Sequence, residues 1–310
     1  MLIRVLAADA GQEFQYAVGN RSTAPGQLAL ATALRLRAKD AFVLGLLGHP
    51  LGHSLSPQIH EAALQALRLP GAYLPFDVPR GSLEPFLESA ERLRVRGLNV
   101  TIPYKEAVAE LMDELDGDAE ALEAVNTVVA KEGWTKGHNT DVFGFRMSLR
   151  SLGLRLGDRT ALVLGAGGAA KAVVHVLLRE GAKVHVANRT PDRAETLADA
   201  FDDGVSVLGL EDVPRKGPWD LLVNATSVGT RGAEPALPIP ETSLDRVRFV
   251  YDLVYNPPET PLLEAARRRG IRRTNGLDML LQQAAASFEL WTGKAAPLPA
   301  MKSAVQEALR

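Results

Sequence analysis

A glycine-rich loop limits the fold of this 310-residue chain more than any other feature. The apolar run Thr160–Leu164 predicts a buried parallel strand, and Gly165-Ala-Gly-Gly-Ala-Ala170 and an amphipathic segment follow it directly. In this strand–loop–helix order, a G-x-G-x-x-G/A motif binds a dinucleotide pyrophosphate at the helix N-terminus. The alternative is a turn that needs its glycines for geometry alone. We expect a cofactor site at Gly165, Ala166, Gly167, Gly168 and Ala169.

The end of the next predicted strand, Lys183–Ala187, indicates which dinucleotide the site prefers. An NAD site usually has an acidic residue about 20 residues beyond the glycine loop, where it binds the ribose hydroxyl. This chain instead has Arg189 and Thr190, with Arg193 about one helical turn later. Two guanidinium groups and a hydroxyl suit a 2′-phosphate, so we expect NADP rather than NAD. Thr190 would also serve as a simple cap for a helix that begins at Pro191, and the two roles are compatible.

Short apolar runs alternate with amphipathic stretches on both sides of this loop, as is typical of α/β proteins. A β-hairpin is expected around Glu132-Gly133, and a helix from Asp141 to Leu152 joins the two series. The first series predicts strands at Phe42–Leu47, Ala72–Phe76 and Gly97–Val100, and helices at Gln58–Leu67, Ser82–Leu93 and Tyr104–Leu115.

These patterns predict an α/β fold class with two domains. We expect an N-terminal α/β substrate-binding domain at 41–140 and a doubly wound Rossmann NADP-binding domain at 141–275. Residues 276–310 are expected to form helices that return to the first domain. Residues 1–40 fit neither series, and we interpret them as a disordered extension or an incorrectly assigned start. A cleft between two such domains is the usual place for cofactor and substrate to meet.

Composition excludes several other classes of protein. The 35 Lys and Arg residues against 37 Asp and Glu residues give a net charge of −2, so no overall positive field attracts nucleic acid or a membrane. No apolar stretch approaches the ~18 residues of a membrane helix, and we see no secretory signal. Without cysteine, the chain has no disulfide or thiolate, and we expect a cytoplasmic protein. His49 and His53 lie in a loop, so no metal site is predicted.

Polar side chains in the first series indicate a second ligand site. Ser54 and Ser56 point the same way in an extended chain, and together they form a plausible fork for a carboxylate. Simple capping of the helix that begins at Pro57 is an equally good interpretation of Ser56. Lys105 follows a buried strand, where a lysine is usually a solvated surface charge. Asp141 begins the joining helix, where it is a candidate functional carboxylate or a cap.

These motifs, in this order, resemble those of the shikimate dehydrogenase family over almost all of Ala41–Gly293. The motifs that carry the resemblance are Gly48-His-Pro-Leu-Gly-His-Ser-Leu-Ser-Pro57, Asn99-Val-Thr-Ile-Pro-Tyr-Lys105, Ala124-Val-Asn-Thr-Val128, Asn139-Thr-Asp141, Gly165-Ala-Gly-Gly-Ala169, Asn188-Arg-Thr190, Asn224-Ala-Thr-Ser-Val-Gly229, Tyr251-Asp-Leu-Val-Tyr255 and Gly276-Leu-Asp-Met-Leu-Leu-Gln-Gln283. Any one of them could be accidental, but the ordered set is specific.

The resemblance implies reversible NADPH-dependent reduction of 3-dehydroshikimate to shikimate, in the pathway to chorismate and the aromatic amino acids. It implies a catalytic pair, Lys105 and Asp141. By matching motif, the implied substrate-binding residues are Ser54, Ser56, Asn99, Thr101, Asn126, Tyr255 and Gln283, and further cofactor-binding residues are Asn188, Arg189, Thr190, Arg193, Thr226, Leu253 and Gly276. The only partner expected is the small-molecule substrate, and a homodimer is an assembly that the sequence leaves open.

Three residues depart from the family pattern without removing an implied contact. Glu61 stands where Asn is usual, Glu123 where Gly is usual, and Asp278 where Gly or Pro is common. Because Asp278 lies in the segment implied to be beside the nicotinamide, we expect it to affect cofactor affinity before chemistry. Two other functions stay open: a quinate/shikimate dehydrogenase that uses NAD, and a non-catalytic regulatory module that binds NADP or shikimate. The module would have no need for both Lys105 and Asp141.

Overall fold

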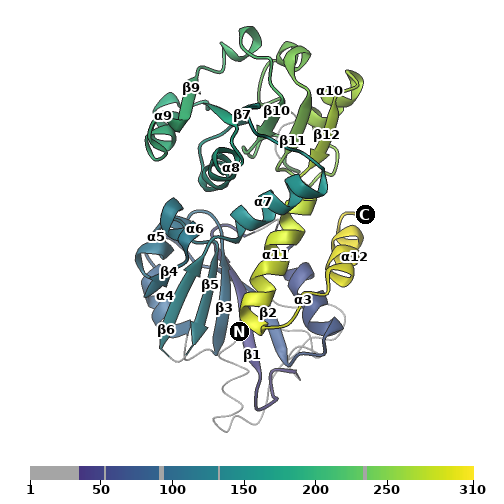
Figure 1. The fold of residues 1–310 in the computed structure, drawn as a ribbon. Helices are drawn as coiled ribbons and strands as arrows, with labels where there is room; N and C mark the ends of the chain where they lie inside the picture. The colour runs from purple at the N-terminus through teal and green to yellow at the C-terminus, as the bar shows by residue number, and fades with distance from the viewer. Residues whose placement is uncertain (1–34, 52–53, 91–93, 132, 233–235) are drawn as a thin grey trace. The chain divides into compact units, whose positions relative to one another are not determined.

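The computed structural model describes residues 35–310 except 52–53, 91–93, 132 and 233–235 (Figure 1). The expected extension at 1–40 and His53 therefore lie wholly or largely outside the described residues. The described chain divides into two compact units. The first contains the residues up to Asn139 together with Ser287–Ala308, and the second contains Thr140–Ala286 and the last two residues.

The first unit is built on a mixed six-stranded sheet with the order β2-β1-β3-β5-β6-β4. Its strands are β1 Phe42–Gly48, β2 Gly71–Asp77, β3 Val95–Val100, β4 Glu114–Leu115, β5 Thr127–Lys131 and β6 Trp134–His138. β1 is buried along its whole length and pairs in parallel with β2 and β3, as expected for a strand covered on both faces. β5 runs antiparallel to β3 and forms the predicted hairpin with β6.

The helices of the first unit are α3 Ser56–Ala66, α4 Leu83–Ala90, α5 Lys105–Glu110 and α6 Gly117–Leu122. The prediction of one helix from Tyr104 to Leu115 is wrong at its C-terminal end, because α5 stops at Glu110 and the chain enters β4. Asp113 explains the change of direction. Its carboxylate accepts hydrogen bonds from the backbone N–H and the hydroxyl of Thr135, at 2.7 and 2.8 Å, and so brings this segment to the edge of β6.

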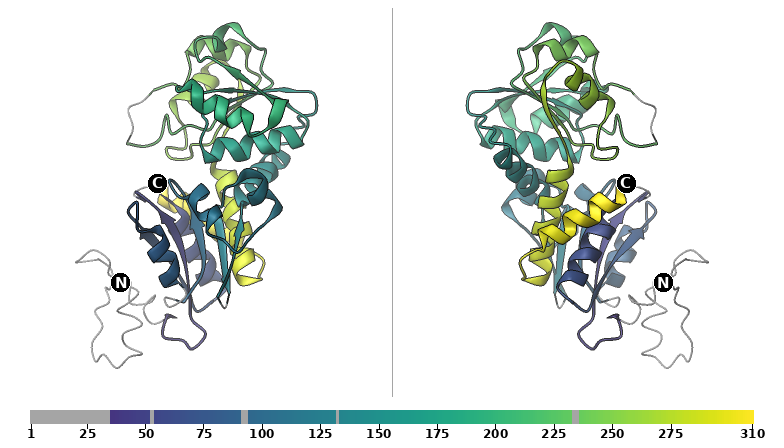
Figure 2. Two further views of the ribbon diagram at one scale, coloured as in Figure 1. Left: turned by 90° about the vertical axis from the view of Figure 1, so that its left-hand side faces the viewer. Right: turned by 90° about the vertical axis from the view of Figure 1, so that its right-hand side faces the viewer.

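Two C-terminal helices complete the molecule: α11 Leu277–Thr292, which contributes to both units, and α12 Leu298–Ala308. α12 lies beside α3, as Figure 1 and the right view of Figure 2 show. The C-terminal part of α11 is joined to the sheet by Trp291, whose indole N–H donates to the carbonyl of Val128 at 2.8 Å. The Trp291 ring packs over Gly97, where a Cβ would lie 2.1 Å from it.

The second unit is an all-parallel six-stranded sheet with the order β12-β11-β10-β7-β8-β9. Its elements are α7 Thr140–Ser151, β7 Thr160–Leu164, α8 Gly168–Arg179, β8 Lys183–Ala187, α9 Pro191–Asp199, β9 Val205–Leu208, β10 Leu221–Asn224, β11 Phe249–Asp252, α10 Pro261–Arg268 and β12 Arg272–Asn275. Taken from β7 as strand one, this order is 3-2-1-4-5-6, the dinucleotide-binding arrangement. The predicted α/β fold class, with a doubly wound unit, is confirmed.

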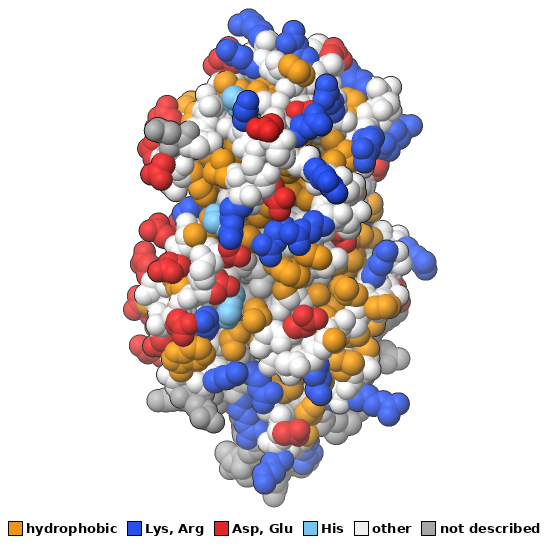
Figure 3. Space-filling model, in the orientation of Figure 1, with side chains coloured by type: hydrophobic (Ala, Val, Ile, Leu, Met, Phe, Trp, Pro, Cys, Tyr) orange, Lys and Arg blue, Asp and Glu red, His pale blue; other side chains and the backbone are white. Residues whose placement is uncertain are grey.

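Surface charge is mixed on the face drawn in Figure 3. Basic and acidic side chains are interspersed on each unit, and acidic side chains gather over α5, α6 and β4. In the described part of the chain, no helix is long and apolar enough to cross a membrane.

Candidate functional site

The first unit gathers its predicted site residues at one edge of its sheet. β1 and β3 both end at this edge, and the antiparallel strand β5 begins there. Thr101 and Asn126 are therefore brought together, with the Val100 N–H donating to the Asn126 carbonyl at 2.7 Å, and Ser56 begins the helix that follows β1. Gly48 makes the close approach possible. A Cβ at this position would lie 2.5 Å from Thr101 Cγ2, so only glycine lets the segment after β1 pack against the segment after β3.

The two serines are hydrogen-bonded to one another. Ser54 Oγ and Ser56 Oγ are 3.2 Å apart, and the Ser56 backbone N–H donates to Ser54 Oγ, also at 3.2 Å. The N-cap of α3 is Leu55, with Pro57 in the first turn, and no side chain caps the helix. Ser56 is therefore not the helix cap, and its buried hydroxyl faces other side chains of the unit.

Asn99 is the centre of a buried hydrogen-bond network at this edge. Its Oδ1 accepts from the Tyr73 hydroxyl at 2.8 Å, and its Nδ2 donates to Thr127 Oγ1 at 3.2 Å and to Ser287 Oγ at 3.0 Å. Thr127 Oγ1 in turn donates to Asn126 Oδ1 at 3.0 Å. Two predicted substrate-binding residues, Asn99 and Asn126, therefore belong to one preorganised network.

Tyr73 and Ser287 were missed by the sequence analysis, although both contribute to this network. The first part of β2, Gly71–Leu74, is buried and otherwise apolar, and Tyr73 is its one side chain with a polar group. A hydroxyl in an otherwise apolar strand is the sequence signal that could have identified Tyr73. Burial raises the pKa of Tyr73 well above its ordinary value, while interaction with the Ser56 side chain acts in the opposite direction. The tyrosine is thus a neutral hydrogen-bonding group that connects β2 to the predicted carboxylate fork.

Lys105 is the first residue of α5 and follows Thr101 by one tight turn. The Tyr104 backbone N–H donates to the Thr101 carbonyl at 3.0 Å, and the buried Tyr104 hydroxyl donates to the Val78 carbonyl at 2.6 Å. The Lys105 carbonyl accepts from the Val125 N–H at 2.8 Å. These bonds fix the backbone of the lysine between the ends of β2 and β3 and the start of β5, so Lys105 lies at the same edge as Thr101 and Asn126.

In the second unit, Asp141 and Gln283 lie on two helices, α7 and α11, that approach one another closely at Gly144. Asp141 lies in the first turn of α7, one helical turn before Gly144. A Cβ on Gly144 would lie 2.7 Å from the Met279 carbonyl oxygen and 2.9 Å from Gln283 Cβ, so α7 and α11 touch through the Gly144 backbone. The Gln283 amide donates to the Leu280 carbonyl at 2.9 Å. Both predicted residues therefore have fixed helical backbones.

The glycine loop depends on its glycines for its backbone conformation. Gly165 has a φ of +106°, a left-handed conformation, and a Cβ there would lie 3.0 Å from the Ala225 carbonyl oxygen. Gly167 is the N-cap of α8, and a Cβ at this position would meet nothing within 4 Å. Ala170 is fully buried where α8 packs on the sheet. Open space at a helix N-terminus, at the strand-order switch between β7 and β10, fits a pyrophosphate.

The segment after β8 presents exposed groups of the kind that bind a phosphate. Arg189, Thr190 and Arg193 are all exposed, and neither arginine pairs with a carboxylate in the part of the chain that the structure describes. Thr190 is the N-cap of α9 by position, but its side chain makes no cap hydrogen bond. Asn188 holds the turn, since its amide donates to the Thr190 carbonyl at 2.9 Å. This donor set fits a 2′-phosphate.

A buried carboxylate organises the loops after β10 and β11. Asp252, with no exposed surface, accepts from Asn224 Nδ2 at 2.8 Å, from the Val254 N–H at 3.1 Å and from the Thr260 hydroxyl at 2.6 Å. Asn224 also accepts from the Thr226 hydroxyl at 2.7 Å. Burial raises the pKa of Asp252 to about 6, and the three hydrogen bonds oppose that rise. Thr226 is thus fixed through Asn224.

Leu253 and Gly276 are brought into direct contact in this region. A Cβ on Gly276 would lie 2.0 Å from the Leu253 carbonyl oxygen, so the chain at the start of α11 approaches the β11 loop backbone to backbone. The Gly276 N–H donates to the neighbouring Val254 carbonyl at 3.4 Å. Tyr255, half-buried, follows on the same loop. Three predicted site residues from two motifs, Leu253 and Tyr255 from one and Gly276 from the other, therefore lie on two adjoining loops.

Three family models match the chain. They are the shikimate dehydrogenase substrate binding domain over residues 46–128, shikimate / quinate 5-dehydrogenase over 147–231, and the shikimate 5'-dehydrogenase C-terminal domain over 276–306. Among curated relatives, shikimate dehydrogenase (NADP(+)) of Methanopyrus kandleri is 48% identical over 280 residues, which cover 86% of this chain and 96% of the relative. The chain belongs to the shikimate dehydrogenase family.

Solved structures of the family extend the similarity to the fold. Shikimate 5-dehydrogenase from Thermus thermophilus, in complex with NADP(H) and shikimate, is 40% identical with a TM-score of 0.75, covering 86% of this chain and 100% of that one. Quinate dehydrogenase from Corynebacterium glutamicum, in complex with NAD, is 34% identical with a TM-score of 0.79, covering 86% and 99%. The family therefore contains relatives of this fold solved with either dinucleotide.

The three departures from the family pattern have local structural roles. Glu61 accepts from the Tyr73 backbone N–H at 2.8 Å and pairs with Arg35. Glu123, where the family usually has glycine, is the C-cap of α6 in a left-handed conformation with φ of 48°, which glycine adopts with less strain. Asp278 accepts from the Ser151 hydroxyl at 2.8 Å, and so joins the first turn of α11 to the end of α7.

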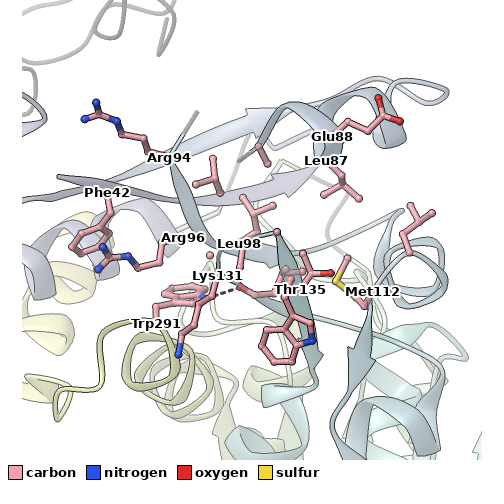
Figure 4. A pocket seen from close by; sticks show the side chains of 18 of the residues that line it. Phe42, Leu87, Glu88, Arg94, Arg96, Leu98, Met112, Lys131, Thr135 and Trp291 are labelled. Carbon is pink, nitrogen blue, oxygen red and sulfur yellow. Dashed lines mark hydrogen bonds between the residues drawn. The ribbon is translucent and has the colours of Figure 1, made fainter. Parts of the chain in front are cut away.

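A large cavity of the first unit lies at the other edge of the sheet, away from the predicted site. It has a volume of about 990 Å³ and is lined at the start of β1 and β3 and the end of β5 (Figure 4). The Arg96 guanidinium lies over the Phe42 ring, 4.3 Å from its centroid. None of the predicted site residues lines this cavity. Among the described residues, no cluster of three metal-binding side chains is present.

Proposed function

We propose that this chain catalyses the reversible NADPH-dependent reduction of 3-dehydroshikimate to shikimate. The observation that carries the proposal is the convergence of Ser56, Asn99 and Asn126 at the sheet edge where Lys105 begins α5. A ring that carries several hydroxyls and one carboxylate needs several such neutral donors and acceptors, held rigidly. The family membership and the glycine loop of the second unit support the same reaction.

Substrate recognition is divided by chemistry in this proposal. Ser54 and Ser56 hold the carboxylate, and Thr101, Asn99 and Asn126 contact hydroxyls. Because Tyr73, Thr127 and Ser287 already bond the Asn99 amide, one lone pair of its Oδ1 remains for the substrate. Tyr255 and Gln283 of the second unit complete the set.

Lys105 and Asp141 carry the proton transfer. NADPH, when bound, supplies the hydride that reaches the C3 carbonyl. The ammonium group of Lys105 protonates the C3 oxygen as its negative charge develops, and the neutral amine removes that proton in the reverse direction. Asp141 orients Lys105 and accepts a hydrogen bond from the hydroxyl beside the reacting carbon. The proposal requires both side chains to act on one bound substrate.

The second unit holds the cofactor in this proposal. The backbone of Gly165–Ala169 and the N-terminus of α8 bind the pyrophosphate. Arg189, Arg193, Thr190 and Asn188 surround the adenosine 2′-phosphate, which makes NADP the preferred dinucleotide. Thr226, Leu253 and Gly276 face the nicotinamide, on loops that are held through Asp252.

One assay separates this function from the alternatives. The absorbance of reduced nicotinamide is followed with NADP⁺ and shikimate, and then with NAD⁺ and quinate. We expect turnover with the first pair and much less with the second. Preference for NAD⁺ and quinate would support a quinate dehydrogenase, to which the similarity to the Corynebacterium glutamicum enzyme also points. Binding of shikimate and NADP⁺ without turnover would indicate the regulatory module.

Location and assembly are further parts of the proposal. The absence of cysteine suits a reducing cytoplasm, where the pathway to aromatic amino acids would supply the substrate. A homodimer is the assembly to test, by measuring the molar mass in solution against the 33.3 kDa of the chain.

A further inference from the structure

We infer that Tyr73 and His60 are positioning residues for substrate binding: the stacked imidazole fixes the tyrosine ring, and the tyrosine hydroxyl fixes the side chains that hold the substrate. The inference rests on the proposed function. It adds two residues that are not among the predicted substrate-binding residues. Both belong to the first unit, Tyr73 on β2 and His60 on α3.

The Tyr73 hydroxyl connects the two ends of the predicted substrate site. It donates to Asn99 Oδ1 at 2.8 Å, and it lies near enough to the Ser56 side chain to be influenced by it. From Asn99 the hydrogen bonds continue through Thr127 to Asn126. One buried hydroxyl thus stands between the carboxylate fork and the amide expected to bind a ring hydroxyl, so its loss would loosen both.

His60 supports the tyrosine by packing rather than by hydrogen bonding. Its ring is fully buried, and neither ring nitrogen makes a hydrogen bond of ordinary geometry in the described structure, while interaction with the Asn99 side chain raises its pKa against the effect of burial. It stacks on Tyr73 with centroids 4.4 Å apart and an interplanar angle of 13°, and the Trp291 ring also contacts it, with centroids 5.1 Å apart. Burying an imidazole that makes no good hydrogen bond costs folding free energy. What the neutral His60 ring contributes in return is its planar packing against the Tyr73 ring.

The tyrosine is also fixed through its backbone from the residue next to His60. Glu61 accepts from the Tyr73 N–H at 2.8 Å and pairs with Arg35. The first turns of α3 therefore hold Tyr73 in two ways, while Ser56 of the same helix belongs to the fork. Movement of α3 relative to β2 would change the distance between the carboxylate fork and Asn99. The stacking of His60 on Tyr73 therefore sets the distance between the groups that hold the two ends of the substrate.

The test is steady-state kinetics of the full-length protein with shikimate and NADP⁺. Tyr73→Phe keeps the ring and its stack but removes the hydroxyl. Because an unpaired buried acceptor and a loosened fork weaken ground-state and transition-state binding alike, we expect KM for shikimate to rise about tenfold. We expect kcat within about twofold of wild type and KM for NADP⁺ unchanged. The matched control is Tyr251→Phe, which removes a buried hydroxyl bonded to Ser148 in the second unit.

The outcomes separate this inference from a purely structural role. KM for shikimate unchanged in Tyr73→Phe, or raised equally in Tyr251→Phe, would overturn it. If Tyr73→Phe does not yield folded protein, His60 carries the test: His60→Ala should raise KM for shikimate, and His60→Phe, which preserves the stack, should not. Equal KM values for the two His60 variants would overturn the inference. A wild-type protein without turnover would instead contradict the proposed function.

Discussion

The two units prepare their predicted ligand sites in different ways. At the edge of the first unit, the side chains themselves are arranged by the protein: Ser56, Asn99 and Asn126 are buried and hydrogen-bonded to other side chains of the unit. In the second unit the backbone is prearranged, at Gly165 and Gly167, while Arg189 and Arg193 remain exposed. A small polyhydroxy acid offers few contacts and needs fixed partners, whereas a charged dinucleotide is attracted by a helix N-terminus and exposed cations.

Burial also shifts the pKa of His60 in the first unit and of Asp252 in the second unit, in opposite directions. Desolvation lowers the pKa of His60 from 6.5 to about 3 and raises the pKa of Asp252 from 3.8 to about 6, because in both cases the neutral form is favoured. Within the described residues the His60 ring nitrogens make no hydrogen bond of ordinary geometry, and only the Asn99 side chain acts against burial, whereas the Asp252 carboxylate accepts three hydrogen bonds. The comparison therefore predicts separable effects of variants in the two units.

The largest effect should come from the predicted proton donor of the first unit. Lys105→Ala removes positioned proton transfer, so we expect turnover to fall by about 10² to 10⁴. NADPH affinity should stay unchanged, because the predicted cofactor residues belong to the other unit. Turnover and NADPH fluorescence titration measure the two effects. Lys131→Ala, an exposed lysine at the other edge of the sheet, is the control. Near-normal turnover of Lys105→Ala would remove the lysine from the mechanism.

The next effect concerns acid stability of the first unit. Since the folded pKa of His60 lies below its unfolded value, the unfolded chain binds the proton first as the pH falls. Stability from the neutral ring is complete above pH 6.5 and is lost between about pH 6.5 and 3, on the order of 5 kcal/mol in all. We expect the free energy of unfolding of His60→Phe, measured by denaturation between pH 6.5 and 3, to lack this part of the dependence on pH. An unchanged slope would show that His60 binds its proton over the same pH range in the folded and the unfolded protein.

Asp252 should show the opposite slope over a narrower range. Its folded pKa lies above the unfolded value, so the folded protein holds the proton more tightly and stability falls as the pH rises from about 4 to about 6. The change is about 3 kcal/mol at most. Asp252→Asn should remove that fall, as read from hydrogen exchange of the β10 and β11 amides at several pH values. A fall of the same size in the variant would assign the effect to another group.

The smallest effect is expected at the exposed cations. Arg189→Ala should weaken NADPH binding about ten- to a hundredfold, since one or two charge-assisted hydrogen bonds are lost. NADH binding should change little, because it lacks the 2′-phosphate. Arg215→Ala serves as the control, because Arg215 is an exposed arginine of the same unit with 82% of its side chain accessible. Equal losses for NADPH and NADH would mean that Arg189 does not bind the 2′-phosphate.

Local patterns were sufficient to predict most strands and the glycine loop. β7 and α8 form where expected. Their positions follow from residues that are adjacent in sequence, namely the apolar run Thr160–Leu164 and the glycines directly after it. The hairpin around Glu132-Gly133 was predicted in the same way. By contrast, the end of α5 depends on the hydrogen bonds between Asp113 and Thr135, which is 22 residues later. The hydrophobic periodicity of the segment cannot predict a contact with a residue so far along the chain.

The network around Asn99 could not have been predicted for the same reason. Ser287 reaches Asn99 from 188 residues away, and Tyr73 from 26. The motif indicated that Asn99 and Asn126 matter, but not that a tyrosine on β2 and a serine on α11 hold them. Helix capping by Ser56 and by Thr190 was also left open by spacing, and it was decided by geometry, since neither side chain caps its helix.

The most direct test of the account is a crystal structure of the protein with NADP⁺ and shikimate both bound. The account predicts Lys105 Nζ within about 3 Å of the C3 oxygen of shikimate, with the nicotinamide against the same carbon and Ser54 and Ser56 on the carboxylate. Lys105 and Asp141 both lying beyond hydrogen-bond reach of that oxygen and its neighbouring hydroxyl would contradict it.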